Sequence, residues 1–269
     1  MAWPLDLLVR IALGLEYDGF RFAGWQTQKD GSGIQDTVEA ALASFVGQPL
    51  ATVCAGRTDA GVHASGQVVH LDSPVPRDEQ AWVRGVNRYL PATVAIRWAR
   101  QVPDDFHARF SARNRTYEYW ILNDPVRSPL HDGRAAWIFQ PLDADAMGEA
   151  AQLLVGTHDY SAFRSAECQA ASPVREVRRF VVERSGRLVR MKVSANAFLH
   201  HMVRNMAGTL VYVGLGRHQP QWAAEVLARR ERAAAAPTLA PCGLYLTRVE
   251  YDRALGLPDL PDAGAPCAP

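Results

Sequence analysis

Two spacings of apolar residues alternate along this chain, and their order limits the folds it can adopt. In residues 9–17 every second side chain is apolar or aromatic, which is the period of a strand. Residues 34–45 instead carry apolar side chains at helical spacing. Segments of both kinds recur in both halves, and several strand segments are hairpin-like neighbours. This order predicts an α+β protein with a largely antiparallel sheet rather than a doubly wound parallel one.

The same patterns predict the other elements. Further strands are expected at residues 52–55, 67–71, 94–98, 106–111, 116–122, 174–183, 188–194 and 244–251. Further helices are expected at residues 82–90, 143–154, 198–213 and 222–230. Ser32 and Gln35 fit a capping box with Ser32 as the N-cap of the first helix. The sequence shows no internal repeat, and the Pro-, Gly- and Ala-rich tail after Tyr251 is predicted to be mobile.

Charge and composition set weak limits on function. The 269 residues suit one large domain or two fused halves, and the formal net charge of +1 gives no whole-chain basic footprint for nucleic acid. Lys29 and Lys192 are the only lysines, so arginine supplies nearly all positive charge, in a planar form suited to phosphate and base contacts. An arginine-rich stretch at residues 175–190 fits either a solvated strand face or an RNA contact.

The cysteines and the N-terminal residues indicate a cytoplasmic protein. The four cysteines are scattered without C-x-x-C spacing, so neither a zinc site nor a disulfide framework is expected. Residues 1–8 lack a secretory pattern, and no uninterrupted apolar run reaches membrane-spanning length. The adjacent His200 and His201 would project about 100° apart around a helix. We therefore expect no functional metal and no membrane association.

The segment with the most chemical information is residues 56–64, Gly-Arg-Thr-Asp-Ala-Gly-Val-His-Ala, between two predicted strands. Gly56 and Gly61 allow sharp turns and close approach of a ligand. Arg57 and Asp59 can flank one pocket, where the arginine would hold the carboxylate ionised and ready to act as a nucleophile. A purely structural turn fits the same residues. A phosphate-binding loop is disfavoured because no Gly-Lys-Ser or Gly-Lys-Thr follows.

This segment closely resembles the signature of the bacterial tRNA pseudouridine synthase A family. Other blocks resemble the same family, and they follow its order from about residue 7 to residue 251. They are residues 17–19, 24–26, 37–39, 66–70, 106–112, 115–117, 198–205 and 240–244. Agreement over this breadth is not expected by chance.

The resemblance implies a fold and an assembly. The family fold is a central, mixed but mainly antiparallel sheet with flanking helices, made of two pseudo-symmetric halves with a cleft between them. Here the halves would be residues 1–112, with the Asp59 loop, and residues 113–252, followed by a mobile tail at residues 253–269. Family members act as homodimers, with one tRNA contacting both subunits.

The resemblance also implies the chemistry. Uridine becomes pseudouridine at positions 38, 39 and 40 of the tRNA anticodon stem-loop, without redox change, metal or cofactor. Asp59 would be the nucleophile, whether it attacks C1′ or C6 or assists a glycal route. Arg57 would aid base flipping, which brings the base to the pocket. Arg204 would pair with Asp59, Tyr117 would stack on the flipped uracil, and Leu244 would form the floor of its pocket.

The expected RNA contacts lie mostly in one block. The residues that match a family RNA-contact segment are Phe106, His107, Ala108, Arg109 and Phe110, and Arg77 lies where the family also touches tRNA. Residues 167–171, at another family contact, carry little positive charge here. Two rival functions remain: an RNA-binding module without catalysis, and a metal-dependent hydrolase using Asp59, His63 and His70. Neither accounts for all the matched blocks.

Overall fold

The computed structural model describes residues 8–258. The helices are α1 (Ile34–Val46), α2 (Glu79–Asn87), α3 (Ala144–Gln152), α4 (Met202–Gly214) and α5 (Trp222–Arg229). The strands are β1 (Val9–Tyr17), β2 (Val53–Cys54), β3 (His63–Ser73), β4 (Val94–Gln101), β5 (Asn114–Asn123), β6 (Ala136–Ile138), β7 (Gly156–Asp159), β8 (Val174–Ser185), β9 (Leu188–Ala195) and β10 (Leu244–Glu250). The expected α+β class is confirmed. Within the described range, no helix is both long and apolar enough to cross a lipid bilayer.

The described chain forms two compact units. The first contains residues 8–113 and 246–258, and the second contains residues 114–245. Most of the last strand, β10, thus belongs to the first unit, where it neighbours β3. The pseudo-symmetry of the predicted halves, residues 1–112 and 113–252, stays a prediction.

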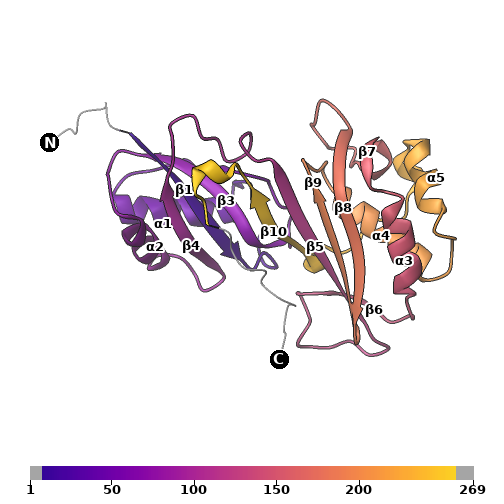
Figure 1. Ribbon diagram of the computed structural model, residues 1–269. Helices are drawn as coiled ribbons and strands as arrows, with labels where there is room; N and C mark the ends of the chain where they lie inside the picture. The colour runs from indigo at the N-terminus through magenta and orange to yellow at the C-terminus, as the bar shows by residue number, and fades with distance from the viewer. Residues whose placement is uncertain (1–7, 259–269) are drawn as a thin grey trace. The chain divides into compact units, whose positions relative to one another are not determined.

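The first unit is built on strands in the order β4-β1-β3-β10, with β2 paired to β3. β1 runs antiparallel to both β3 and β4. Helices α1 and α2 contact each other beside these strands (Figure 1). A separate apolar cluster contains Ala12, Val68, Trp98 and Phe106. Gly14 makes this packing possible, because a Cβ there would lie 2.1 Å from Trp98 Nε1.

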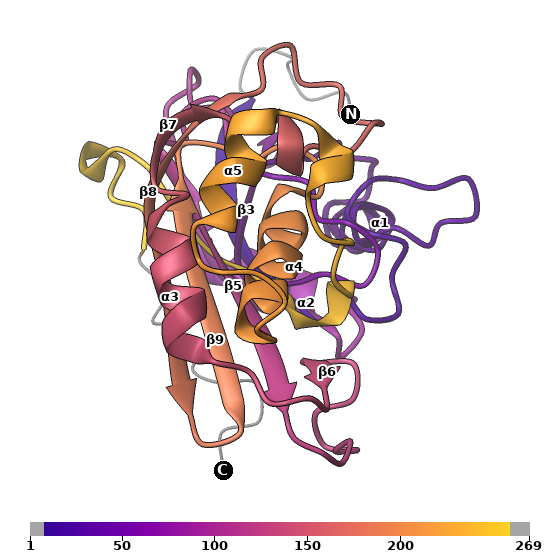
Figure 2. The same cartoon turned by 90° about the vertical axis from the view of Figure 1, so that its right-hand side faces the viewer.

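The second unit has the strand order β5-β9-β8-β7, with each neighbouring pair antiparallel, and β6 pairs in parallel with β5. Figure 2 shows α3, α4 and α5 in front of these strands. Alternate residues of β9, from Val189 to Ala195, are buried, whereas those between them are half-buried. This is the pattern of a strand with one face on a core and the other more polar.

The strand predicted at residues 106–111 is wrong, because these residues form turns. The main-chain N–H of Ser111 donates to the carbonyl of His107 over 2.8 Å. His107 Nδ1 also accepts from the N–H groups of Arg109 and Phe110. Local hydrogen bonds of this kind replace those that a strand would need from a neighbour.

The first helix begins at Ile34 as predicted, but its predicted N-cap is wrong. Gly33, not Ser32, is the N-cap, and the carboxylate of Asp36 accepts from the Gly33 N–H over 3.0 Å. The Ser32 hydroxyl instead donates to Asp30 Oδ1 at 2.6 Å. The helix predicted from residue 198 begins at Met202, since His201 has a left-handed backbone with φ of 62°.

Other elements were not predicted. The short strands β6 and β7 have too few residues to show a period. In the predicted mobile tail, Arg253–Leu255 form a 3-10 helix whose first turn is capped by the Asp252 side chain. The part of that tail from residue 259 onward lies outside the described residues.

Candidate active site

The loop between β2 and β3 presents Arg57 and Asp59 at the surface of the first unit. Arg57 is exposed and Asp59 is half-buried, while Thr58 between them is 6 % exposed. The loop closes through a turn in which the Val62 N–H donates to the Asp59 carbonyl over 3.1 Å. Gly61 has a φ of +76°, which glycine adopts without strain. We call residues 56–62 the Asp59 loop.

Thr58 is held on both its main chain and its side chain. The Trp25 N–H donates to the Thr58 carbonyl over 2.9 Å, and the hydroxyls of Tyr17 and Thr58 lie 2.8 Å apart. Gly24 lets the Trp25 segment approach, because a Cβ there would lie 2.8 Å from the Thr58 carbonyl oxygen. The residue before Asp59 is therefore fixed, which restricts where the Asp59 carboxylate can lie.

The far end of the Asp59 loop is held as firmly. The Gly19 N–H donates to His63 Nδ1 over 3.1 Å, and Asp18 Oδ1 lies 3.1 Å from the same nitrogen. A Cβ on Gly19 would lie 1.9 Å from the Val62 carbonyl oxygen, so the two chain segments touch. The resemblance had placed both segments in the family pattern, but not this contact between them.

His63 and His70 cannot serve one metal ion with Asp59, as the hydrolase alternative requires. Both lie on β3, seven positions apart, which separates them by roughly 20 Å along a strand. His63 Nδ1 is engaged at Gly19, and His70 Nδ1 accepts from the Ala108 N–H over 3.1 Å. The structure therefore gives the hydrolase alternative no shared site.

The predicted RNA-contact segment, residues 106–110, presents only part of itself to solvent. Phe106 and Ala108 are buried, whereas Arg109 is exposed and Phe110 is 75 % exposed. The His107 ring lies 4.3 Å from the Phe110 ring, and the Arg109 guanidinium lies 5.6 Å from it. Exposed aromatic and cationic groups suit stacking on bases and contact with phosphate. Phe106 and Ala108 instead hold the turn in place.

Both main-chain polar groups of Ala108 are hydrogen-bonded to side chains. Its N–H donates to His70, and its carbonyl accepts from the Tyr251 hydroxyl over 2.7 Å. Burial, with Arg10 and His107 nearby, lowers the pKa of His70 to about 4. His70 is therefore neutral near pH 7, which leaves a ring nitrogen able to accept from Ala108.

Within the first unit, the Asp59 loop and the RNA-contact segment converge. Burial raises the pKa of the Cys54 thiol to about 11, and the charges of both Arg57 and Arg109 act against that rise. Both arginines therefore lie within electrostatic range of one buried sulfur. β2, which ends at Cys54, pairs with β3 at His70 and Val69. The sequence alone did not show that these two arginines lie near the same residue of β2, Cys54.

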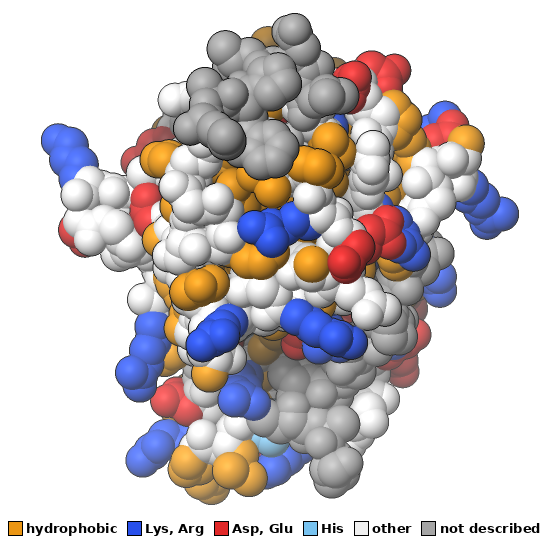
Figure 3. All heavy atoms as spheres, turned by 90° about the vertical axis from the view of Figure 1, so that its left-hand side faces the viewer, with side chains coloured by type: hydrophobic (Ala, Val, Ile, Leu, Met, Phe, Trp, Pro, Cys, Tyr) orange, Lys and Arg blue, Asp and Glu red, His pale blue; other side chains and the backbone are white. Residues whose placement is uncertain are grey.

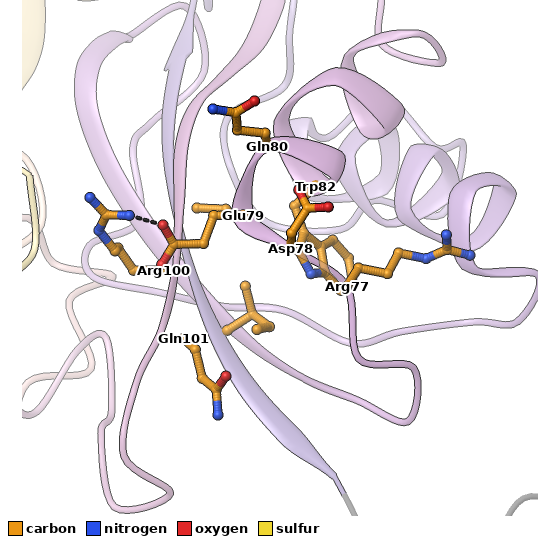
Figure 4. Close-up of a pocket in the computed structure, with 9 residues that line it drawn as sticks. Arg77, Asp78, Glu79, Gln80, Trp82, Arg100 and Gln101 are labelled. Atoms are coloured by element: carbon orange, nitrogen blue, oxygen red, sulfur yellow. Dashed lines mark ion pairs between the residues drawn. The ribbon is translucent and has the colours of Figure 1, made fainter.

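Arg77 lies away from this convergence. It is exposed just before α2, and its guanidinium lies 4.6 Å from the centre of the Phe45 ring. It lines a shallow cavity of about 530 Å³, in which Glu79 pairs with Arg100 (Figure 4). Asp78 caps α2 by accepting from the Ala81 N–H. Both acidic side chains of this cavity, Asp78 and Glu79, are thus engaged in holding the local structure. None of the residues that line the cavity belongs to the Asp59 loop.

The face of the first unit that carries α1 and α2 is not uniformly basic. Figure 3 shows lysine and arginine side chains there with acidic side chains and apolar patches between them. This mixture agrees with a formal net charge of +1. On this face, positive charge for RNA must therefore come from particular side chains rather than from a basic surface.

Three predicted site residues lie in the second unit. Tyr117, in β5, is 8 % exposed and meets the Phe198 ring edge-on at 5.1 Å. Leu244, at the start of β10, is 5 % exposed. It follows a 3-10 turn, Pro241–Gly243, whose glycine lies against the Trp120 carbonyl and the Tyr119 ring.

Arg204, on α4, is oriented by a segment that the sequence analysis overlooked. Its Nε donates to the Leu239 carbonyl over 2.8 Å. The neighbouring Asn205 is fully buried, and its side-chain oxygen accepts from Thr238 over 2.6 Å and from Arg232 over 3.1 Å. Residues 232–239 thus lie along α4 and hold the Arg204 guanidinium at its Nε. Nothing in the spacing of these residues signals the contact.

The backbone of His201 is strained. Its left-handed conformation, three residues before Arg204, is uncommon for a residue with a side chain and costs on the order of 1 kcal/mol. The His200 and His201 rings lie 4.0 Å apart. Strain of this kind persists where the surroundings impose it, and it clusters at functional sites.

Comparison with known proteins identifies the relatives of this chain. A family model described as tRNA pseudouridine synthase matches residues 15–111 and 150–252. A tRNA pseudouridine synthase A of Herminiimonas arsenicoxydans is 56 % identical over 253 residues, covering 93 % of this chain and 92 % of that protein. Proteins of the same name from Methylibium petroleiphilum and Ralstonia nicotianae are 56 % and 54 % identical, over 93 % and 94 % of this chain and 96 % and 94 % of theirs.

The low pKa of His70 predicts a pH-dependent stability. Unfolded histidine titrates near 6.5, so below that pH the unfolded chain binds a proton that folded His70 takes up only near pH 4. The urea midpoint of the protein should therefore fall as pH drops from 6.5 toward 4, and His70→Gln should make that fall shallower. Replacing the exposed His218 by glutamine serves as control. Equal slopes for the protein and His70→Gln would contradict the expectation.

Proposed function

The chain belongs to the tRNA pseudouridine synthase family, and from this we propose that it isomerises uridine at positions 38, 39 and 40 of the tRNA anticodon stem-loop, with Asp59 as nucleophile. The observation that carries the assignment is the fixed position of Asp59. It follows the buried Thr58, which is tied to Trp25 and Tyr17, and Asp59 itself is nonetheless only half-buried. A nucleophile needs this combination of order and access.

The reaction is balanced without a co-reactant. The bond between C1′ and N1 breaks, the uracil rotates, and a bond forms between C1′ and C5. The proton of C5 is lost to solvent and N1 takes up a proton, so the product is an isomer of the substrate. Asp59 attacks C1′ or C6, or assists a glycal route. Each route uses an ionised carboxylate at a fixed place beside the base or the ribose.

Base flipping precedes the chemistry, because a stacked base hides its reacting atoms. Arg57 is exposed two residues before Asp59, which suits a side chain that fills the space left by the flipped base. Tyr117 offers a ring to the uracil, with Phe198 holding that ring edge-on, and Leu244 offers an apolar floor. From the family resemblance, Arg204 is assigned the role of orienting the catalytic carboxylate.

Several exposed arginines and one aromatic ring fit the phosphates and bases of the bound tRNA. Arg109 and Phe110 are exposed on the same unit as the Asp59 loop, and Arg77 adds a further exposed cation beside Phe45. The stretch at residues 175–190 contributes less than its arginine count implies, since Arg178 pairs with Glu176 and Arg190 with Glu183. Such contacts position the RNA without reading its sequence.

The working form of the enzyme is a homodimer in the cytoplasm, with one tRNA contacting both subunits. The tRNA substrate supports the cytoplasmic location, because tRNA is made and used there. The family resemblance supports the dimer. No cofactor takes part.

The direct test of this function is tritium release from tRNA labelled at C5 of uridine. The protein should release tritium, because bond formation at C5 expels that hydrogen, and Asp59→Asn should release none while keeping its tRNA affinity. Release by both proteins would support the enzymatic activity but contradict the role of Asp59 as nucleophile. No release by either, with tRNA bound, would favour an RNA-binding module without catalysis.

A second prediction concerns Arg57. Arg57→Ala should abolish turnover but leave the dissociation constant for tRNA within about threefold, since one of many phosphate contacts is lost. Arg97, an exposed arginine paired with Glu16, provides the control, and Arg97→Ala should keep both values. If Arg57→Ala loses tRNA binding and turnover to the same extent, the proposed role of Arg57 in base flipping is contradicted.

A further inference from the structure

A fully buried glutamine reaches the Asp59 loop from the sheet. Gln67 lies on β3 with 0 % of its surface exposed, and its Nε2 donates to the Gly56 carbonyl over 2.7 Å. Gly56 begins the Asp59 loop. A buried amide donor aimed at a loop carbonyl fixes that carbonyl, because water cannot replace it.

An irregularity in the sheet gives Gln67 this direction. Leu15 pairs with Gln67, yet Tyr17 pairs with Ala64, so β3 has one more residue than β1 over this stretch. Such a bulge bends a strand and turns its side chains, and bulges are common beside active sites. Gly66 fits here because a Cβ would lie 2.1 Å from the Thr247 carbonyl oxygen.

Tyr17 extends the connection to Thr58. Its hydroxyl lies 3.3 Å from Gln67 Nε2, which donates to it, and 2.8 Å from the Thr58 hydroxyl. Tyr17 is 3 % exposed and Thr58 is 6 % exposed, so the chain of hydrogen bonds runs through a dry interior. These hydrogen bonds hold the Asp59 loop at Gly56 and at Thr58. The two residues lie on either side of Arg57, and Thr58 directly precedes Asp59.

The two ends of this series of hydrogen bonds differ in the number of other interactions that stabilise them. On the sheet side, β1 and β3 are joined by a ladder of backbone pairs along most of their length. On the loop side, Thr58 has the Trp25 N–H and the Tyr17 hydroxyl. Loss of the phenol oxygen would therefore disturb the loop more than the sheet. A displacement of about 1 Å in a reacting group can cost on the order of 100-fold in rate.

We propose that Gln67 and Tyr17 are positioning residues for the uridine isomerisation, which hold the Asp59 loop through Gly56 and Thr58 so that the carboxylate meets the flipped nucleotide. The proposal rests on the proposed role of Asp59 as nucleophile. Neither side chain needs to touch the tRNA to act in this way.

The test compares single-turnover rates at saturating tRNA with tRNA affinity. Tyr17→Phe removes one oxygen and should lower the rate about tenfold or more, with the dissociation constant changed by less than about twofold. Gln67→Glu replaces the donor to Gly56 with an acceptor and should lower the rate further. Thr58→Val removes the other end of the same bond, so the double variant Tyr17→Phe/Thr58→Val should be no slower than the slower single variant.

The matched control is Tyr160→Phe. Tyr160 is a fully buried tyrosine of the second unit, and its hydroxyl donates to the carbonyls of Leu154 and Gly156 at 2.7 and 3.1 Å. Its loss should lower the urea midpoint at least as much as Tyr17→Phe does, without a comparable loss of rate.

Three results would overturn the proposal: an unchanged rate in Tyr17→Phe, equal rate losses in Tyr17→Phe and Tyr160→Phe at equal loss of stability, or additive losses in the double variant. Asp59→Asn is measured in the same assay. If Asp59→Asn is inactive and Tyr17→Phe keeps the full rate, the positioning proposal alone fails. If Asp59→Asn keeps its activity, the nucleophile assignment fails and the positioning proposal fails with it.

Discussion

The hydrogen bond between the buried hydroxyls of Tyr17 and Thr58 limits where the neighbouring Asp59 carboxylate can lie. It links the end of β1 to the loop between β2 and β3, across 41 residues of sequence. The close approach of Gly24 and Gly19 holds the same loop at two further points. A short loop with little bulk of its own thus takes its shape from the sheet beneath it, which orders a carboxylate before substrate binds.

The RNA-contact segment depends on the same strand. β3 carries Gln67, which reaches Gly56, and His70, which accepts from Ala108. One strand therefore supports both the loop proposed for catalysis and the turn that presents Arg109 and Phe110. Since His70 must stay neutral to accept that hydrogen bond, its low pKa has a structural role. Changes at Gln67 and at His70 would therefore act on different parts of the site, the first on the Asp59 loop and the second on the RNA-contact turn.

Local patterns in the sequence were enough for the long elements and for the residues that match the family. They failed where a distant or competing partner decides the structure. Asp36 accepts from Gly33 and makes it, rather than Ser32, the N-cap of α1, and His107 folds residues 106–111 into turns. The contact of Arg204 with Leu239, and that of Tyr17 with Thr58, join residues far apart along the chain. Periodicity carries no information about such pairs, so the supports of the candidate site became visible only in the structure.

We expect the position of the Asp59 carboxylate, and not merely its charge, to produce catalysis. Asp59→Glu keeps the charge and moves the carboxylate outward by about one C–C bond, roughly 1.5 Å. Its single-turnover rate of pseudouridine formation at saturating tRNA is therefore the decisive measurement. We expect this rate to fall at least about 100-fold, with tRNA affinity unchanged. A rate within about threefold of the unaltered protein would contradict it, because a carboxylate that tolerates such displacement needs no fixed loop.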